Sequence, residues 1–158
     1  MDELARALGE QLKRARAILV TAESCTGGWA AQVVTSVAGS SDWFDHGYVT
    51  YSNDAKRELL GVRAETLSKH GAVSEETARE MAQGALARGR GTVALAITGV
   101  AGPAGGSATK PVGTVCFAWA TKQGARMETK HFSGDRESVR RQSVIHALQG
   151  VMQTLDAA

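Results

Sequence analysis

The arrangement of apolar residues constrains the fold of this chain more than any other feature of its sequence. Three short runs have the length and composition of buried strands: RAILVTAE (16–23), HGYVTYS (46–52) and GTVALAITG (91–99). Between them lie longer segments whose apolar residues recur every three or four positions, as they do in amphipathic helices. Strands that alternate with helices predict an α/β fold.

The last third of the chain departs from this alternation. Residues 112–134 have the composition of strands on both sides of the short segment KQG, which predicts a hairpin. A hairpin adds antiparallel strands to a sheet that is otherwise parallel. We therefore expect a three-layer α/β/α sandwich with a mixed, mostly parallel sheet, built as a single domain over residues 1–158.

Residues that favour helix N-termini mark where three of the helices begin. Asn53 is the expected N-cap of the segment NDAKRELLGV. Ser74 precedes two glutamates, which suit the positive first turn of a helix. Asp135 is the expected N-cap of a long terminal helix.

Charge and hydropathy exclude several classes of partner. The formal net charge is only +2, with acidic and basic residues interspersed, so the chain has no basic face that would indicate nucleic acid. The apolar runs are far shorter than the roughly 20 residues that cross a bilayer, and the N-terminal segment MDELARALGE reads as an amphipathic helix without a signal core. We expect a cytoplasmic protein with no membrane or nucleic-acid partner.

The cysteines and histidines give no metal-binding pattern. Cys25 and Cys116 are far apart in sequence and form no CxxC pair, which suits free thiols in a reducing compartment. Cys116 lies within a predicted strand and is expected to be a small buried apolar residue. We expect neither a metal nor another cofactor.

Three polar corners follow the three predicted parallel strands: TAESCTGG, TYSNDAK and ITGVAGPAGG. Open α/β sheets bind ligands outside the carboxyl ends of their strands, where these corners lie. Each corner alone is also explained by turn chemistry, because turns favour Ser, Thr, Asn and Gly. All three together favour a binding site.

The first corner carries a candidate nucleophile, Ser24. Next to a helix N-terminus, unpaired N–H groups favour negative charge, and Gly27 and Gly28 let a ligand approach the backbone. Ser24 or Thr26 would alternatively serve only as the helix cap. Cys25 is a rival nucleophile, but it has no histidine neighbour in sequence to lower the pKa of its thiol.

A serine nucleophile needs a base. The four histidines have no paired spacing and no GxSxG segment occurs, so a Ser-His-Asp triad is unsupported. Lys56, on the helix after the second strand, is the alternative, with Tyr51 as a proton relay between it and the serine. Such a lysine must be desolvated or lie beside another cation to lose its proton near neutral pH, whereas an ordinary helix lysine is exposed.

The third corner matches no common phosphate or acyl-transfer motif. GPAGGSATK is not a Walker loop, and in SATK the following Pro111 biases Lys110 away from the helical turn which that motif needs. What remains is a glycine-rich rim with Thr98 at the strand end and backbone amides that are free to contact a ligand.

Five segments resemble, in order, the motifs of the CinA C-terminal domain family: AESCTGG, YVTYSNDAK, GAVSEETA, ITGVAGPAGGSATKPVGTV and SGDRESVRRQ. The similarity runs from about residue 4 to about residue 152. It implies an α/β/α fold with a mixed sheet, a homodimer, and metal-free hydrolysis of the carboxamide of nicotinamide mononucleotide to the acid and ammonia. Larger members carry a second domain before this one, for which 158 residues leave no room, so we expect the stand-alone form.

The resemblance also implies roles for individual residues. Its catalytic group matches Ser24, Tyr51 and Lys56, the trio that the search for a base reaches. We expect an acyl-enzyme on Ser24, with backbone amides around Cys25 to Gly28 holding the oxyanion. The implied substrate-binding residues are Cys25, Thr26, Gly27, Gly28, Thr98, Gly99, Gly102, Gly105, Gly106 and Arg140.

Arg136 and Arg140 lie one turn apart on the terminal helix, and arginine binds phosphate bidentately. Arg140 is the expected phosphate ligand, with the loop from Gly102 to Gly106 as the alternative. Arg136 is expected to pair with Asp135, Glu137 or solvent. Two other functions remain open from the residues alone: a nucleotide-binding module without chemistry, and hydrolysis of another small amide by the same dyad.

Overall fold

The computed structural model describes all residues from 1 to 158 and contains one five-stranded mixed sheet. The strands are β1 (Leu19–Glu23), β2 (Phe44–Val49), β3 (Val93–Gly99), β4 (Thr114–Thr121) and β5 (Gly124–His131). Their order across the sheet is β2-β1-β3-β4-β5. β1 is parallel to both β2 and β3, whereas the pairs β3–β4 and β4–β5 are antiparallel, so the predicted hairpin forms one edge.

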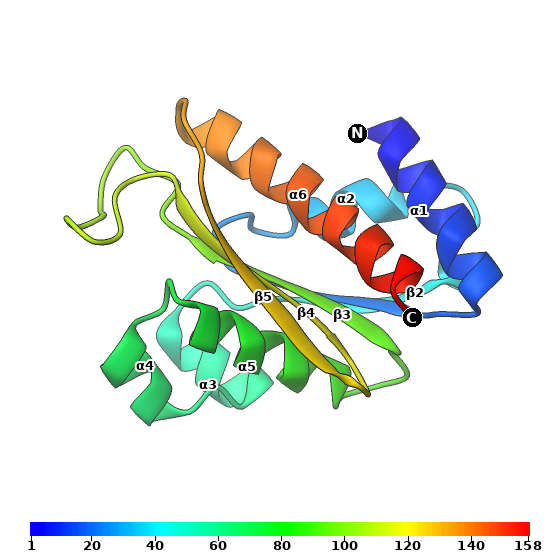
Figure 1. Cartoon of the computed structure of the whole chain (residues 1–158), viewed down its shortest axis with the longest axis horizontal. Coiled ribbons are helices and arrows are strands. Elements are labelled where there is room, and N and C mark those ends of the chain that lie inside the picture. Colours follow the sequence, from blue (N-terminus) through cyan, green and yellow to red (C-terminus); the bar gives the residue numbers. More distant parts are fainter.

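Six α-helices cover the two faces of this sheet. They are α1 (Asp2–Ala15), α2 (Trp29–Thr35), α3 (Asn53–Leu60), α4 (Ala64–His70), α5 (Glu75–Leu86) and α6 (Arg136–Asp156). Figure 1 shows α1, α2 and α6 on one face and α3, α4 and α5 on the other. The predicted three-layer α/β/α sandwich is confirmed. No helix combines the length and the apolar character needed to span a membrane.

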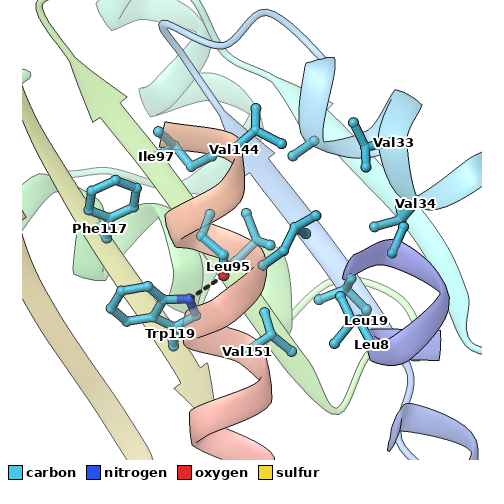
Figure 2. Packing of buried hydrophobic residues seen from close by; sticks show 14 of the residues in the cluster. Leu8, Leu19, Val33, Val34, Leu95, Ile97, Phe117, Trp119, Val144 and Val151 are labelled. Atoms are coloured by element: carbon cyan, nitrogen blue, oxygen red, sulfur yellow. Dashed lines mark hydrogen bonds between the residues drawn. The ribbon is translucent and has the colours of Figure 1, made fainter. Parts of the chain in front are cut away.

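The two faces of the sheet differ in side-chain size. On the face toward α1, α2 and α6, the central strands place Leu95, Phe117 and Trp119 in a large core cluster (Figure 2). On the face toward α5, alternate positions of the same strands are mostly alanine. Small side chains let α5 approach the sheet closely, because little volume separates the two backbones.

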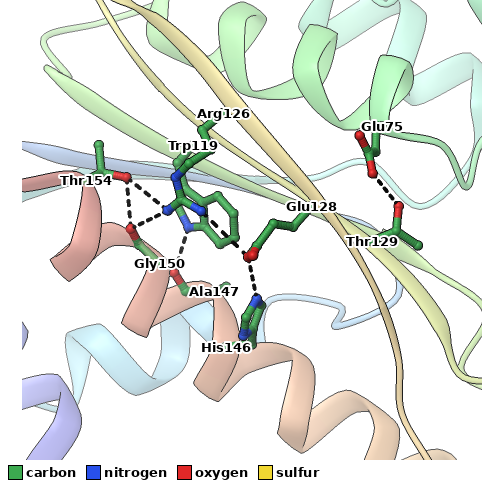
Figure 3. A network of polar contacts seen from close by, with 9 residues as sticks. All are labelled: Glu75, Trp119, Arg126, Glu128, Thr129, His146, Ala147, Gly150 and Thr154. Carbon is green, nitrogen blue, oxygen red and sulfur yellow. Dashed lines mark hydrogen bonds and ion pairs between the residues drawn. The ribbon is translucent and has the colours of Figure 1, made fainter. Parts of the chain in front are cut away.

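Helix α6 is fixed to the sheet by tight packing and by polar contacts. The indole of Trp119 donates to the Ala147 carbonyl at 2.9 Å, and an added Cβ at Gly150 would lie 2.0 Å from the Trp119 ring. Arg126 of β5 lies 4.1 Å above the same ring and donates to the Gly150 carbonyl (Figure 3). His146 and Glu128 join the helix to β5 at 3.0 Å. These contacts fix the middle and the carboxyl-terminal half of α6 against β4 and β5.

Two of the three predicted N-cap residues are confirmed by the structure. Ser74 and Asp135 are N-caps, because their side chains accept from the Thr77 and Ser138 amides. The prediction for Asn53 is wrong by one residue. Ser52 is the N-cap, accepting from the Ala55 amide at 3.0 Å, and Asn53 is the first helical residue. The helix α4 was not predicted.

Candidate active site

The three polar corners meet at the carboxyl edge of the sheet, as predicted. The Ser24 amide donates to the Ile97 carbonyl of β3 at 2.9 Å. The Thr50 amide donates to the Glu23 carbonyl of β1 at 2.8 Å. These two bonds continue the parallel ladders past the strand ends, so the segments after β1, β2 and β3 lie side by side.

Ser24 and Lys56 are in direct contact. Lys56 Nζ lies 3.0 Å from Ser24 Oγ and 2.8 Å from the Thr50 carbonyl, with the Tyr51 carbonyl at 3.4 Å. The alternative of an exposed helix lysine is wrong, because Lys56 is only 1% exposed. A neutral amine has two N–H donors and one lone pair, and these match two carbonyls and one hydroxyl.

Burial lowers the pKa of the Lys56 ammonium from its ordinary value of 10.5, because the charged form loses its hydration. The opposing influence is a charge on the Cys25 thiol. That thiol is itself buried, and desolvation raises its pKa to about 12. Cys25 therefore stays neutral near pH 7, where it neither holds a proton on Lys56 nor supplies the thiolate that a cysteine nucleophile needs.

Glu23 is a site residue that the sequence reading missed. Its buried carboxylate accepts from the Thr26 hydroxyl at 2.6 Å and from three amides at the start of α2. These are the amides of Gly28 at 3.2 Å, Ala30 at 2.9 Å and Ala31 at 3.1 Å. Neither Ser24 nor Thr26 is the helix cap, because Glu23 satisfies the donors of that N-terminus.

The contacts of Glu23 narrow the set of amides that can hold an oxyanion. Of the predicted group from Cys25 to Gly28, the Gly27 amide donates to the Ser24 carbonyl and the Gly28 amide to Glu23. The amides of Cys25 and Thr26 donate to no protein acceptor, although both residues are buried. Buried donors without a partner are rare and unfavourable, so these two amides are the ones available to a ligand.

Tyr51 lies beside the dyad but does not bridge it. Its hydroxyl accepts from Arg136 at 3.2 Å, and its side chain is 61% exposed. Arg136 also donates to the Gly102 carbonyl at 2.8 Å. The expected pairing of Arg136 with Asp135 or Glu137 is therefore wrong. Arg136 is exposed to solvent, as expected, but it also joins the start of α6 to Tyr51 and the glycine-rich loop.

The glycine-rich loop after β3 projects from the carboxyl edge of the sheet near the start of α6 (Figure 1). Gly102, Gly105 and Gly106 all have positive φ, and their amides donate to no protein group. Thr98 is buried at the base of this loop, where its hydroxyl donates to the Ala72 carbonyl at 2.8 Å. The loop thus offers free backbone donors, as predicted, while the donor of Thr98 is used within the fold.

Arg140 contacts the first corner. Its Nε donates to the Cys25 carbonyl at 3.0 Å, and a terminal nitrogen donates to the Thr26 carbonyl at 3.2 Å. Its guanidinium lies 5.4 Å from the centre of the Trp29 ring. The structure thus brings Arg140 to the predicted site, on the opposite side of the corner from Lys56.

The site has no donor set for a metal, because no three His, Cys, Asp or Glu side chains gather anywhere in the structure.

Comparisons with known proteins agree with this architecture. The family model described as CinA C-terminal domain matches residues 1–155. The curated Escherichia coli K12 protein named "Nicotinamide-nucleotide amidohydrolase PncC" is 55% identical over 96% of this chain and 92% of its own length.

Two solved structures are also similar. A competence/damage inducible protein from Agrobacterium tumefaciens superposes with a TM-score of 0.93 at 45% identity, covering 98% of this chain and 94% of its own. A CinA superfamily protein from Klebsiella pneumoniae gives a TM-score of 0.96 at 40% identity, with coverages of 99% and 98%.

Proposed function

Since this chain belongs to the CinA C-terminal domain family, we propose that it hydrolyses the carboxamide of nicotinamide mononucleotide to nicotinate mononucleotide and ammonia. The chain is an amidohydrolase, as are the curated relatives that match nearly its whole length. The name of the Escherichia coli relative supports the nucleotide as substrate.

One observation carries the mechanism: the 3.0 Å contact between the Lys56 amine and the Ser24 hydroxyl at a buried position. Serine is a weak nucleophile until a base removes its proton, and an amine is an effective base only after desolvation lowers its pKa. Both conditions are met at one contact. No other base in the chain is bonded to Ser24.

In the first half of the reaction, the lone pair of neutral Lys56 takes the Ser24 proton while Ser24 Oγ bonds to the carboxamide carbon. The carbonyl oxygen becomes an oxyanion, to which the Cys25 and Thr26 amides donate. The Lys56 ammonium then returns the proton to the amide nitrogen, the C–N bond breaks, and ammonia leaves. An ester of Ser24 with the nicotinate nucleotide remains.

In the second half, water replaces ammonia. Lys56 takes a proton from the water as its oxygen bonds to the ester carbon, and the same two amides again hold the oxyanion. Collapse of this intermediate breaks the bond to Ser24 Oγ, which takes the proton back from Lys56. Tyr51 lies at the exposed rim with Arg136, where it orients the substrate beside the dyad.

The ribose phosphate needs donors outside the reacting corner. Two groups qualify: the free amides of Gly102, Gly105 and Gly106 with Arg136 beside them, and the remaining N–H groups of Arg140. Arg140 already donates to two carbonyls, whereas the loop amides have no acceptor. We therefore favour the loop amides as the phosphate subsite, with Arg140 as the alternative.

We further propose that the reaction takes place in the cytoplasm and that the protein is a homodimer. Two free buried thiols suit a reducing compartment. Exposed apolar side chains at Val49, the last residue of the edge strand β2, and at Tyr51, two residues later, offer a surface for a second copy. Light scattering during gel filtration measures the oligomeric state.

The test is to incubate the purified chain with nicotinamide mononucleotide and to quantify ammonia and nicotinate mononucleotide together. Equal amounts of both products, and none with Ser24→Ala, are expected. Binding of the nucleotide without any product would identify a binding module, and turnover of other amides but not this one would identify another amidase.

A further inference from the structure

The loop from Ser24 to Gly28 is held from two sides by charged groups. From inside, the Glu23 carboxylate binds the Thr26 hydroxyl and the α2 amides. From the neighbouring helix α6, which lies on the same face of the sheet as α2 (Figure 1), Arg140 binds the carbonyls of Cys25 and Thr26. Thr26, which is fully buried, is thus fixed through both its side chain and its backbone.

The geometry of the peptide bond links these carbonyls to the oxyanion donors. In a trans peptide, the C=O of one residue and the N–H of the next point in opposite directions within one plane. The only cis bond in the chain is Gly102–Pro103, so the peptide between Cys25 and Thr26 is trans. Holding the Cys25 carbonyl on the α6 side therefore directs the Thr26 amide away from α6. Lys56 approaches Ser24 from α3, on the other face of the sheet.

The position of Arg140 is itself determined by its neighbours. Its guanidinium and that of Arg141 lie 5.4 and 5.6 Å from the centre of the Trp29 ring, near the start of α2. The guanidinium of Arg140 is planar and rigid, and its two donors restrain both carbonyls at once. A lysine ammonium, which is a single flexible point charge, would restrain them less well. Arg141 shares the aromatic contact but donates to neither carbonyl.

We propose that Arg140 is a positioning residue for the oxyanion site: by binding the Cys25 and Thr26 carbonyls, it orients the Thr26 amide toward the reacting carbon. This inference rests on the proposed amide hydrolysis at Ser24. It predicts that Arg140 contributes to the rate of the chemical step, measured as kcat, and does not bind the phosphate. Removal of an oxyanion donor slows enzymes by roughly 10²- to 10³-fold, and a donor that is misdirected but present has a smaller effect. Loss of Arg140 should lower kcat by about ten- to a hundredfold and leave KM within about twofold.

The experiment compares Arg140→Ala and Arg140→Lys with Arg141→Ala as the matched control. Steady-state kinetics on nicotinamide mononucleotide give kcat and KM, and thermal melting by circular dichroism shows whether each variant is folded. We expect a loss in kcat for Arg140→Ala, a smaller loss for Arg140→Lys, and wild-type constants for Arg141→Ala. Guanidinium ion added at millimolar concentration should restore part of the kcat of Arg140→Ala, which a general loss of structure would not allow.

A second measurement does not depend on the nucleotide being the substrate. A small fluorophosphonate labels an activated serine, and its phosphoryl oxygen must enter the same oxyanion site; mass spectrometry gives the labelling rate of Ser24. We expect the rate to fall in Arg140→Ala by a factor similar to that in kcat, even if the nucleotide proves not to be the substrate. An unchanged labelling rate overturns the inference. So does a raised KM with an unchanged kcat, which would make Arg140 the phosphate ligand.

Discussion

Replacement of Lys56 by methionine tests whether a buried amine is the base. Methionine keeps an unbranched side chain of similar length in a site that is 1% exposed, but it has no group that accepts a proton. General-base catalysis contributes about 10²- to 10⁴-fold, so kcat should fall by that factor, or roughly 3 to 5 kcal/mol of barrier. Lys56→Arg should be nearly as damaging, because a guanidinium does not lose its proton in the working range.

The same substitution has a predicted effect on stability. Removing the amine leaves the Thr50 carbonyl without its donor at 2.8 Å, an unfavourable change of about 1 to 3 kcal/mol. It also removes the cost of desolvating the amine, so the net change near pH 7 should be within about 2 kcal/mol. Lys69→Met on α4, where the lysine is exposed, is the matched control and should change neither activity nor stability.

The pH dependence of the free energy of unfolding tests whether the pKa of Lys56 is lowered in the folded protein. The Lys56 pKa is lowered in the folded protein, so between that value and 10.5 the unfolded chain binds more protons than the folded one. The free energy of unfolding of the wild type, relative to Lys56→Met, should therefore rise with pH through this window. Urea unfolding at several pH values measures it. The acid limb of kcat/KM should likewise have an apparent pKa below 10.5. The reasoning would be refuted if the free energies of unfolding of the wild type and Lys56→Met changed in parallel with pH and Lys56→Met remained active.

Three further predictions concern the nucleophile, the packing of α6 and the absence of a metal. Ser24→Ala should abolish turnover, and it should change the free energy of unfolding by only about 1 kcal/mol, the contribution of one hydrogen bond. Cys25→Ala should remain active. An active Ser24→Ala variant would indicate that Cys25 is the nucleophile. Gly150→Ala should destabilise the chain by roughly 1 to 3 kcal/mol or more in urea unfolding, because its Cβ would lie 2.0 Å from the Trp119 ring; an unchanged midpoint would contradict this packing. Activity should persist in a metal chelator, because no cluster of three His, Cys, Asp or Glu exists; loss that a divalent ion restores would contradict this.

The position of the site could be predicted from the sequence because three strand ends carry turn residues at once. Parallel strands place their carboxyl ends at one edge, so Ser24, Tyr51 and Thr98 had to lie near one another. The burial of Lys56 is less evident, since lysine on a short helix is usually exposed. One signal was available: Leu60 lies four residues later on the same face of α3, and that residue is buried.

Glu23 was missed because the carboxylate reads as the polar end of a strand. Its four partners lie three, five, seven and eight residues further on, a spacing that only the fold of the corner brings together. The available signal was the start of α2, where Gly28 occupies the cap position and has no side chain. A helix that begins without a capping side chain needs another acceptor, and the nearest acidic residue is Glu23.

The corner thus contains a buried acid and a buried amine, one on each side of Ser24, and the proposed mechanism, in which the amine acts as a base, depends on their separation. A carboxylate beside Lys56 would favour the ammonium and keep its proton in place. In this structure the Glu23 carboxylate points to α2, where four donors stabilise its charge, and it is absent from the groups that shift the Lys56 pKa. Lys56 meets only carbonyls and a hydroxyl, none of which carries a compensating charge. The acid therefore holds the loop from Ser24 to Gly28 in place, while the amine, without a counter-ion, is the group that gives up its proton in the proposed mechanism.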